Sequence, residues 1–280
     1  ARDMRNKANQ VKTPEGELDI ESEKYKLLYA KADILLNISM KLANTHDKNN
    51  IMQECRELFY DKDFEKTLDQ DRYLLCCENG VIDFRNKTFR KGTPEDYLSK
   101  CTKINFREID EKKDAPMMKE ISDYMSKLFP IPELCEYAWN HLASILIGDT
   151  AKTQCLHYWN GHGQNGKSML VKFMQSILGE YVTDLDISFF VHDRPGRGNA
   201  TQELLSPIGA RMAITSEPSE GEKLNEGPMK QLTSGVDSIS YRGLFKEQES
   251  FVPQCHSVIM ANHFLPVRST DHGTWRRIVV

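Results

Sequence analysis

The sequence predicts an α/β protein in which a parallel sheet follows a smaller, mostly helical α+β region. Short apolar runs alternate with segments of helical periodicity from about residue 153 to the end. Before that point, apolar residues recur mainly at the spacing of helices, with one interruption that resembles a hairpin. Strands alternating with helices are typical of a sheet covered by helices, whereas separate runs of helices and strands are typical of α+β domains.

The part before residue 149 contains more helical than extended patterns. Apolar residues between Ile20 and Leu42 recur at helical spacing. Residues 1–16 contain Pro14 and Gly16 without an apolar period, which indicates a linker. Apolar runs flank Asn79-Gly80, a strong hairpin dipeptide. We therefore predict helices near 20–42, 48–60, 117–129 and 132–148, a hairpin around Asn79-Gly80 and a possible strand within 100–108.

The part from residue 149 onward changes to short, regularly alternating elements. Apolar runs of strand length are separated by segments with helical periodicity, one of which is closed by Gly179. We predict strands at 155–160, 210–217 and 256–262, helices at 167–179 and 227–235, and an unfinished strand at 276–280.

These patterns divide the chain into three parts. Residues 1–65 are predicted to form a helical segment with a linker, 66–148 an α+β domain, and 149–280 a separate α/β domain. The chain does not begin with Met and stops within an apolar run, so we expect it to be a fragment of a larger protein.

Composition excludes several classes of protein. Hydrophobic residues make up 39% and charged residues 28%, which permits a buried core. No apolar run reaches the roughly 18 residues of a membrane span, and the polar start lacks the apolar stretch of a secretory signal. The seven cysteines include no C-x-x-C pair, which disfavours a disulfide framework or structural zinc and favours a reducing, intracellular location. The net charge of −4 gives no argument for DNA binding.

Residues 161–168 match the phosphate-binding pattern G-x-x-x-x-G-K-[ST] in full. Glycines let the backbone curl so that its N–H groups face phosphate oxygens, and the following helix directs its positive end at them. Lys167 would contact the β and γ phosphates of ATP, and the Ser168 hydroxyl would bind Mg²⁺. The predicted nucleotide-binding residues are Gly161, His162, Gly163, Gln164, Asn165, Gly166, Lys167 and Ser168.

Two polar residues follow neighbouring strands downstream of this loop. Glu217 ends the run ARMAITSE, where an NTPase of this type needs an acid for Mg²⁺ or water. Asp184 and Asp186 are competitors, but no clean apolar strand precedes them. Asn262 follows HSVIMA and could orient the attacking water, although an ordinary turn-forming Asn is the favoured alternative from the residues alone.

Several ordered segments together resemble one family. GHGQNGKS, ARMAITSEP, K-x-LTSG with a following D-S-I-S-Y-R, HSVIMANHFLP and a terminal Arg-Arg pair occur in this order. With the upstream CCENGVIDFRNKTFRKG segment, they are similar to the superfamily 3 helicases of the primase-helicase branch found in poxviruses, asfarviruses, giant viruses, phages and plasmids. The resemblance covers roughly residues 70–280 and implies an AAA+-like P-loop ATPase fold.

The resemblance also implies residue roles. Glu217 takes the family's acidic position, although Ser216 stands where the family often has a second acid. Lys230, Asp237 and Arg242 match the motif between acid and sensor, with Gly235-Val236-Asp237 one residue longer than the common Gly-Asp. Pro266 fits the N-x-x-x-P that begins at the sensor amide. The implied catalytic residues are Lys167, Glu217, Asn262 and the arginine finger, Arg276 or Arg277, with Arg277 slightly favoured.

The family's architecture predicts a ring that moves on DNA. A finger arginine acts on the nucleotide of a neighbouring subunit, so the resemblance implies a homo-hexamer. A hairpin between Ser238 and Ser257, with a polar tip at residues 246–249, would contact single-stranded DNA through Arg242 and Lys246, with Lys230 as a further candidate. Arg194 and Arg197 lie in a loop for which solvent exposure is the favoured interpretation.

The predicted function is therefore a replication helicase driven by ATP and Mg²⁺, moving 3′ to 5′ and opening forked duplex. A primase domain in the same parent polypeptide and a viral replication site in the host cytoplasm are implied with it. A P-loop small-molecule kinase should be monomeric and indifferent to DNA. A DNA-packaging ATPase would need a nuclease partner and respond to duplex DNA, and an adaptor would bind ATP without turnover.

Overall fold

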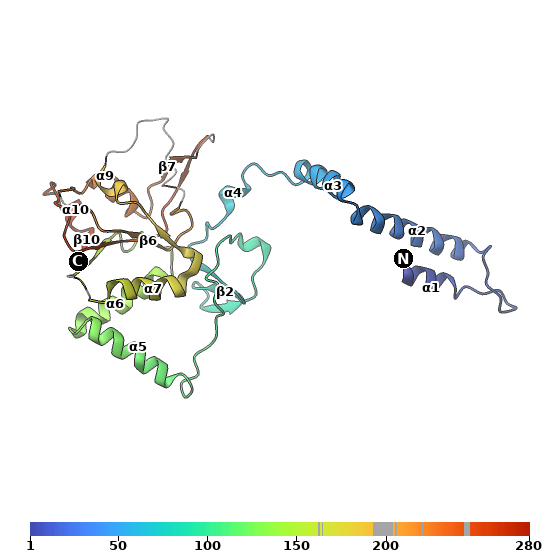
Figure 1. Cartoon of the computed structure of the whole chain (residues 1–280), viewed down its shortest axis with the longest axis horizontal. Helices are drawn as coiled ribbons and strands as arrows, with labels where there is room; N and C mark the ends of the chain where they lie inside the picture. Colours follow the sequence, from blue (N-terminus) through green and yellow to red (C-terminus); the bar gives the residue numbers. More distant parts are fainter. Residues whose placement is uncertain (162, 164, 193–203, 205, 220, 244–246) are drawn as a thin grey trace. The chain divides into compact units, whose positions relative to one another are not determined.

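The computed structural model describes residues 1–161, 163, 165–192, 204, 206–219, 221–243 and 247–280. They form two compact units, Ala1–Phe64 and Glu65–Val280 (Figure 1). The second unit contains both parts that the sequence divides at residue 148, and that division stays a prediction. Within the described residues, every helix is too short or too polar to cross a bilayer.

The first unit is entirely helical in its regular structure. It contains α1 (Arg2–Ala8), α2 (Glu23–Ala43) and α3 (Thr45–Leu58). Ser22 caps α2 by accepting the N–H of Tyr25, and Asn44 caps α3 by accepting the N–H of His46. These caps mark the starts of the two helices that were predicted near 20–42 and 48–60.

The linker predicted for residues 1–16 is wrong over α1. This helix packs on α2 through small residues, since Ala8 and Ala32 are fully buried. Arg5 adds an ion pair, with its Nη2 3.0 Å from Oδ1 of Asp33. A helix that docks through alanine and arginine leaves no apolar period in the sequence, which is why the pattern missed it.

The second unit begins with a small antiparallel sheet and two helices. The hairpin is confirmed, but its turn lies at Glu78-Asn79, and Gly80 is the first residue of its second strand. A Cβ on Gly80 would stand 2.6 Å from the carbonyl oxygen of Arg90, so this crossing requires glycine. The elements are α4 (Phe64–Thr67), β1 (Leu74–Cys77), β2 (Gly80–Asp83), β3 (Thr88–Arg90), the 3-10 turn η1 (Pro94–Asp96), α5 (Ala115–Leu128) and α6 (Pro132–Ile145).

The possible strand within residues 100–108 is absent from the described structure. The N–H of Thr102 does bond to the Cys76 carbonyl at 2.9 Å, beside β1. Lys103 then takes a left-handed conformation with φ of 61°, which breaks the extended path. An apolar alternation therefore occurs here without a continuous ladder.

A five-stranded sheet forms the centre of the second unit. Its order is β10-β4-β9-β6-β5, and all neighbouring strands are parallel. The predicted strands are confirmed, whereas β5 was missed because it is a three-residue edge strand ending at Asp184. The strands are β4 (Leu156–Asn160), β5 (Val182–Asp184), β6 (Met212–Thr215), β9 (His256–Ala261) and β10 (Ile278–Val279).

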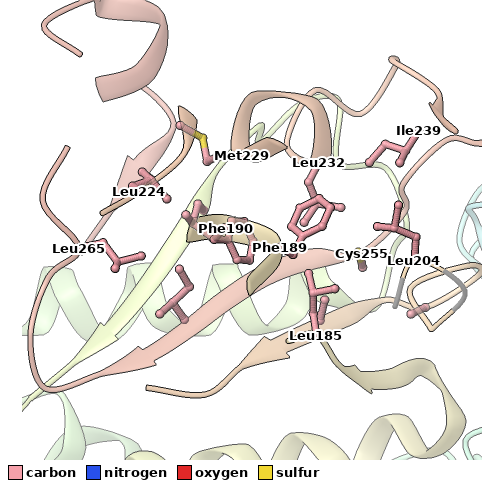
Figure 2. Close-up of a cluster of buried hydrophobic side chains, with 14 of the residues drawn as sticks. Leu185, Phe189, Phe190, Leu204, Leu224, Met229, Leu232, Ile239, Cys255 and Leu265 are labelled. Carbon is pink, nitrogen blue, oxygen red and sulfur yellow. The ribbon is translucent and has the colours of Figure 1, made fainter. Parts of the chain in front are cut away.

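Helices cover both faces of this sheet, as the α/β prediction requires. On one face, α6 and α7 pack on side chains such as Ile214 and Val258. On the other, Phe190 and Met229 pack on alternate strand residues (Figure 2). The remaining elements are α7 (Lys167–Leu178), the 3-10 turn η2 (Gly179–Tyr181), α8 (Ser188–Val191), β7 (Ile239–Arg242), β8 (Gln248–Phe251), α9 (Glu226–Leu232) and α10 (His272–Trp275).

A buried arginine joins the small sheet to the amino ends of the central strands. Arg211 precedes β6 and is 1% exposed. Its Nη2 donates to the carbonyl oxygens of Asp71 at 3.1 Å and Leu74 at 3.0 Å, and its Nη1 donates to Gln254. A Cβ on Gly148 would lie 2.5 Å from Nη1, so a glycine is needed beside the guanidinium. This contact fixes the segment before β1 under the sheet.

Three histidines are buried between α6 and the sheet. The rings of His141 and His157 stack with centroids 3.7 Å apart, and His256 lies edge-on to His141 at 6.1 Å. Burial lowers the pKa of His157 and of His256 to about 4. Burial and the two neighbouring imidazoles lower the pKa of His141 to about 2. All three rings are therefore neutral in the folded protein near pH 7.

Replacing Arg211 by Met should destabilise the second unit by about 3–5 kcal/mol, because two backbone carbonyls and Gln254 lose their buried partner. Urea unfolding followed by tryptophan fluorescence measures this, since Trp139, Trp159 and Trp275 all lie in this unit. Arg85→Met is the control: Arg85 also pairs with the Asp71 segment, but its side chain is 52% exposed, and the cost should stay below about 1 kcal/mol. Equal losses would contradict the buried contact.

Lowering the pH should weaken the second unit before its carboxylates titrate. Unfolded imidazoles bind protons below their ordinary pKa of about 6.5, whereas the folded ones resist until about pH 4. Their stabilising effect is therefore complete above pH 6.5 and lost as the pH falls toward 4, by about 1.4 kcal/mol per pH unit for each ring.

Urea titrations at pH 7, 6 and 5 measure this slope. His256→Asn should reduce the slope of unfolding free energy against pH by the contribution of one ring, about 1.4 kcal/mol per pH unit. Substitution of the exposed His263 should leave this slope unchanged. A slope that His256→Asn does not alter would show that other groups cause the pH dependence.

Candidate nucleotide-binding site

The phosphate-binding motif lies where the sequence predicts it, between a central strand and a helix. β4 ends at Asn160, and α7 begins at Lys167. Gly166 precedes the helix with a left-handed φ of 83°, which turns the chain into α7 without a Cβ penalty. The predicted site residues His162 and Gln164 lie outside the described residues. α7 is long enough for its first N–H groups and dipole to attract an anion.

Lys167 bridges the carboxyl ends of two neighbouring strands. Its Nζ donates to the carbonyl oxygen of Gly161, after β4, and to that of Ala261 at 2.9 Å, at the end of β9. The same ammonium lies 2.6 Å from Oδ1 of Asn262. The positive charge is thus held at the mouth of the loop by neutral oxygens, which an incoming phosphate can replace.

Glu217 and Asn262 meet at the same edge of the sheet. Both carboxylate oxygens of Glu217 accept from Asn262: Oε1 from its backbone N–H at 3.0 Å and Oε2 from its Nδ2 at 3.1 Å. Asn262 therefore touches Lys167 through its oxygen and Glu217 through its nitrogens. The structure brings together three residues predicted from separate segments of the sequence.

An open cavity of about 410 Å³ joins these residues. Ser168 and Glu217 both line it, together with Lys167 and Asn262. A hydroxyl and a carboxylate are oxygen donors of the kind that Mg²⁺ prefers, and this ion usually takes its remaining ligands from phosphates and water. Within the described part of the chain, no group of three or more His, Cys, Asp or Glu could hold a metal alone. The donor set therefore fits an ion that is bound together with a nucleotide.

The terminal arginines do not reach this cavity. Arg276 and Arg277 directly precede β10, which runs parallel to β4 with Ile278 beside Leu156. They therefore lie at the amino ends of the strands. About six residues of extended chain, or roughly 20 Å, separate the amino ends of the strands from the phosphate loop at their carboxyl ends. Arg276 is exposed, whereas Arg277 is half-buried and donates to the carbonyl oxygen of Gly273 at 2.6 Å.

The predicted DNA-contact residues lie on two different elements. β7 and β8 pair antiparallel, with Arg242 opposite Gln248 near the tip. Lys246 lies outside the described residues. The polar tip was predicted too long, because β8 begins at Gln248 and Glu249 receives a 2.5 Å bond from the Tyr241 hydroxyl across the hairpin. Burial and this bond raise the pKa of Tyr241 to about 12.

Lys230 belongs to α9 and lies apart from the hairpin strands in sequence. Its Nζ is 3.0 Å from Oδ2 of Asp271. The backbone N–H of Asp237, which shares its predicted motif, donates to the Ser234 hydroxyl oxygen at 2.8 Å. The structure thus ties Lys230 to the segment that precedes the terminal arginines.

An aromatic cavity beside the loop was not predicted. It measures about 280 Å³ and adjoins the motif at Asn165 and Lys167. The Tyr137 hydroxyl and Nε2 of His157 lie 2.9 Å apart in its wall. Tyr137 and His141 are one turn apart on α6, and His157 and Trp159 are two residues apart on β4, so each pair lies on one face of its element. These two spacings are the sequence pattern from which the aromatic cavity could have been predicted. Its lining includes Leu128, Phe129, Tyr137, Ala138, His141, His157 and Trp159.

Comparisons with known proteins match this architecture. Residues 2–127 match the family model described as "D5 N terminal like". A protein of Acanthamoeba polyphaga mimivirus, provisionally named a helicase, is 34% identical over 262 residues, covering 94% of this chain and 27% of that protein. A protein of African swine fever virus, provisionally named a primase, is 26% identical over 246 residues, covering 85% and 25%.

A solved structure of the C-terminal region of NrS-1 aligns with 61% of this chain and 37% of that chain, at 15% identity and a TM-score of 0.42. The chain spans about a quarter of the length of the curated relatives it matches. The D5-like model matches residues 2–127, and the viral relatives align with most of the chain. The chain belongs to the viral primase-helicase family.

Proposed function

We propose that this chain is the ATP-hydrolysing motor of a superfamily 3 DNA helicase. The observation that supports this most is the single hydrogen-bonded line Lys167–Asn262–Glu217 at the mouth of a phosphate loop. An ammonium, an amide and a carboxylate around one open cavity are the groups that phosphoryl transfer to water requires.

In this proposal the triphosphate binds along the loop and the start of α7. Lys167 exchanges its bonds to the Gly161 and Ala261 carbonyls for phosphate oxygens, which strengthens its interaction because the new partners are charged. Ser168 and Glu217 would hold Mg²⁺, which would supply positive charge against the β and γ phosphates. The loop thereby fixes the γ-phosphate against the end of β9, where Asn262 lies.

Glu217 and Asn262 then prepare the attacking water. Glu217 accepts a proton as the water oxygen bonds to the γ-phosphorus and the bond to the β-phosphate oxygen breaks, leaving ADP and inorganic phosphate. Asn262 holds both carboxylate oxygens of Glu217 in place, so the amide acts as the sensor between phosphate and acid.

The aromatic cavity is the natural place for the adenine ring. It shares Asn165 and Lys167 with the phosphate cavity, so a nucleotide can occupy both at once. Its walls are formed by flat rings from α6 and β4, on which a base can stack. The buried histidines in its wall are neutral near pH 7, which suits a neutral purine.

The missing positive charge at the γ-phosphate comes from another subunit. The terminal arginines lie roughly 20 Å from their own loop, so they can serve only a neighbouring copy. Arg276 is exposed and is the better donor, whereas Arg277 is engaged with Gly273. This arrangement supports the proposed homo-hexamer, in which ATP binds at each junction between subunits.

The β7–β8 hairpin is the proposed contact with single-stranded DNA, through Arg242 and Lys246. Placing Glu249 in β8, where Tyr241 binds its carboxylate, separates one of the two acids from the tip. The ring would move 3′ to 5′ into forked duplex at a viral replication site in the host cytoplasm. A primase domain in the same polypeptide would supply primers.

Lys167→Ala should reduce DNA-stimulated ATP hydrolysis by about 100-fold or more, because a preorganised positive charge at the transferred phosphate is lost. Turnover measured with and without single-stranded DNA tests this. Lys172→Ala, on the exposed side of the same helix, is the matched control and should retain activity. Full stimulated turnover in Lys167→Ala would exclude the loop as the active site.

Two inactive variants should restore activity when they are mixed. The Lys167→Ala chain lacks the lysine that binds phosphate but retains Arg276. The Arg276→Ala chain lacks the arginine but retains Lys167. A junction between the two can combine an intact Lys167 with an intact Arg276 of the neighbour, so mixed rings should recover about a quarter of wild-type turnover at random assembly.

Native mass measurement with ATP and single-stranded DNA shows whether the mixed species are hexamers. Arg277→Ala, in place of Arg276→Ala, identifies which arginine acts across the junction. A small-molecule kinase would show neither the six-fold assembly nor the recovery.

A further inference from the structure

Helix α9 binds the segment before the terminal arginines through hydrogen bonds and an ion pair. Glu226 and Lys230 are one turn apart on α9 and point to the same side. Oε1 of Glu226 accepts the backbone N–H groups of Arg268 at 3.1 Å and Ser269 at 2.9 Å. Lys230 lies 3.0 Å from Oδ2 of Asp271. Three consecutive contacts therefore fix residues 268–271 on one helix face.

Asp271 also bonds to α10 and so links this short helix to α9. Its Oδ1 accepts the N–H of Thr274 at 2.9 Å, and its Oδ2 accepts the Thr274 hydroxyl at 2.8 Å. Bonds from Ser269, Lys230 and Thr274 hold the pKa of the Asp271 carboxyl well below its usual range. A four-residue helix cannot sustain itself in isolation, so α10 depends on this cap and on the fully buried Thr274.

α9 is itself a rigid support. Pro228, Met229 and Leu232 are buried against the sheet core (Figure 2). Asn225 caps its start by accepting the N–H of Gly227 at 3.2 Å. The direction in which the chain leaves α10 is therefore set by α9, and Arg276 is the next residue.

The Lys230–Asp271 pair contributes little to stability on its own. The two side chains are 38% and 48% exposed, and ion pairs with such exposure are typically worth about 1 kcal/mol or less. Orientation is more sensitive than stability, because a displacement of about 1 Å in a catalytic group can cost up to 100-fold in rate.

We propose that Lys230 and Asp271 are positioning residues for hydrolysis in the adjacent subunit: α9 holds α10 so that Arg276 projects toward the neighbour's γ-phosphate. This rests on the proposed transfer of an arginine between subunits. It replaces DNA contact as the role of Lys230. A change at Lys230 therefore acts on the active site of the next chain and leaves the chain's own site intact.

Placing Lys230→Met in one of two mixed subunits tests this directly. In rings of Lys167→Ala and Arg276→Ala chains, the productive junction takes its arginine from the Lys167→Ala chain. Adding Lys230→Met to that chain should lower the restored turnover about tenfold or more. Adding it to the Arg276→Ala chain, whose finger is already absent, should change turnover less than twofold. Lys230→Arg in the arginine-donating chain should restore activity, because it can still pair with Asp271.

Three further measurements distinguish a positioning role of Lys230 from a role in ATP binding, DNA binding or folding. ATP affinity and single-stranded DNA affinity of the Lys230→Met protein should stay within twofold of wild type, and its thermal unfolding midpoint should show that it is folded. Equal loss from both placements, no loss from either, or a DNA affinity that falls severalfold would overturn the positioning role. If the original mixture restores nothing while each parent still forms hexamers, the transfer between subunits fails first, and this inference fails with it.

Discussion

The buried guanidinium of Arg211 is the interaction on which the second unit depends. It lies under the amino ends of β6 and β9, where it joins the carbonyls of Asp71 and Leu74 to the side chain of Gln254. A charge removed from water is tolerated only when it is well hydrogen-bonded: both terminal nitrogens of this guanidinium are bonded, whereas its Nε has no partner among the described residues. Gly148, three residues after α6, lies against the same guanidinium, and α6 contributes Tyr137 and His141 to the aromatic cavity beside β4.

The parallel sheet places the proposed catalytic groups at two opposite ends of its strands. The carboxyl ends of β4, β6 and β9 carry the phosphate loop, Glu217 and Asn262, as expected for an open α/β sheet. The amino ends carry Arg211 and, before β10, the terminal arginines. One chain therefore contains both halves of a reaction centre but cannot bring them together. This geometric constraint favours a ring more strongly than composition does, since the net charge of −4 alone indicates no polyanion binding.

Sequence patterns predicted what depends on local periodicity and short motifs. The loop, α7, β4, β6 and β9 each have an apolar period or a glycine pattern of their own, and the carboxyl ends of parallel strands had to meet. The missed features depend on distant partners. β5 is a polar edge strand paired with β6, and α1 docks through alanine. Lys230 meets Asp271 across 41 residues, and the aromatic cavity combines α5, α6 and β4. The strand predicted within 100–108 was wrong because one left-handed residue interrupts it.

The contacts of Asn262 suggest how occupancy of the loop reaches the acid. Its Oδ1 is held by Lys167, while its Nδ2 and backbone N–H hold Glu217. When the lysine turns to a phosphate, the amide oxygen loses its charged donor but the nitrogens keep the carboxylate. Rotating the amide to find a new donor would break the bond to Oε2, whereas the backbone bond to Oε1 would remain. In the proposed mechanism, one oxygen of Glu217 would turn toward water once Lys167 has bound phosphate, while the backbone N–H of Asn262 would keep the other oxygen in place. Asn262 would thereby couple nucleotide binding to activation of the acid without any movement of the strands.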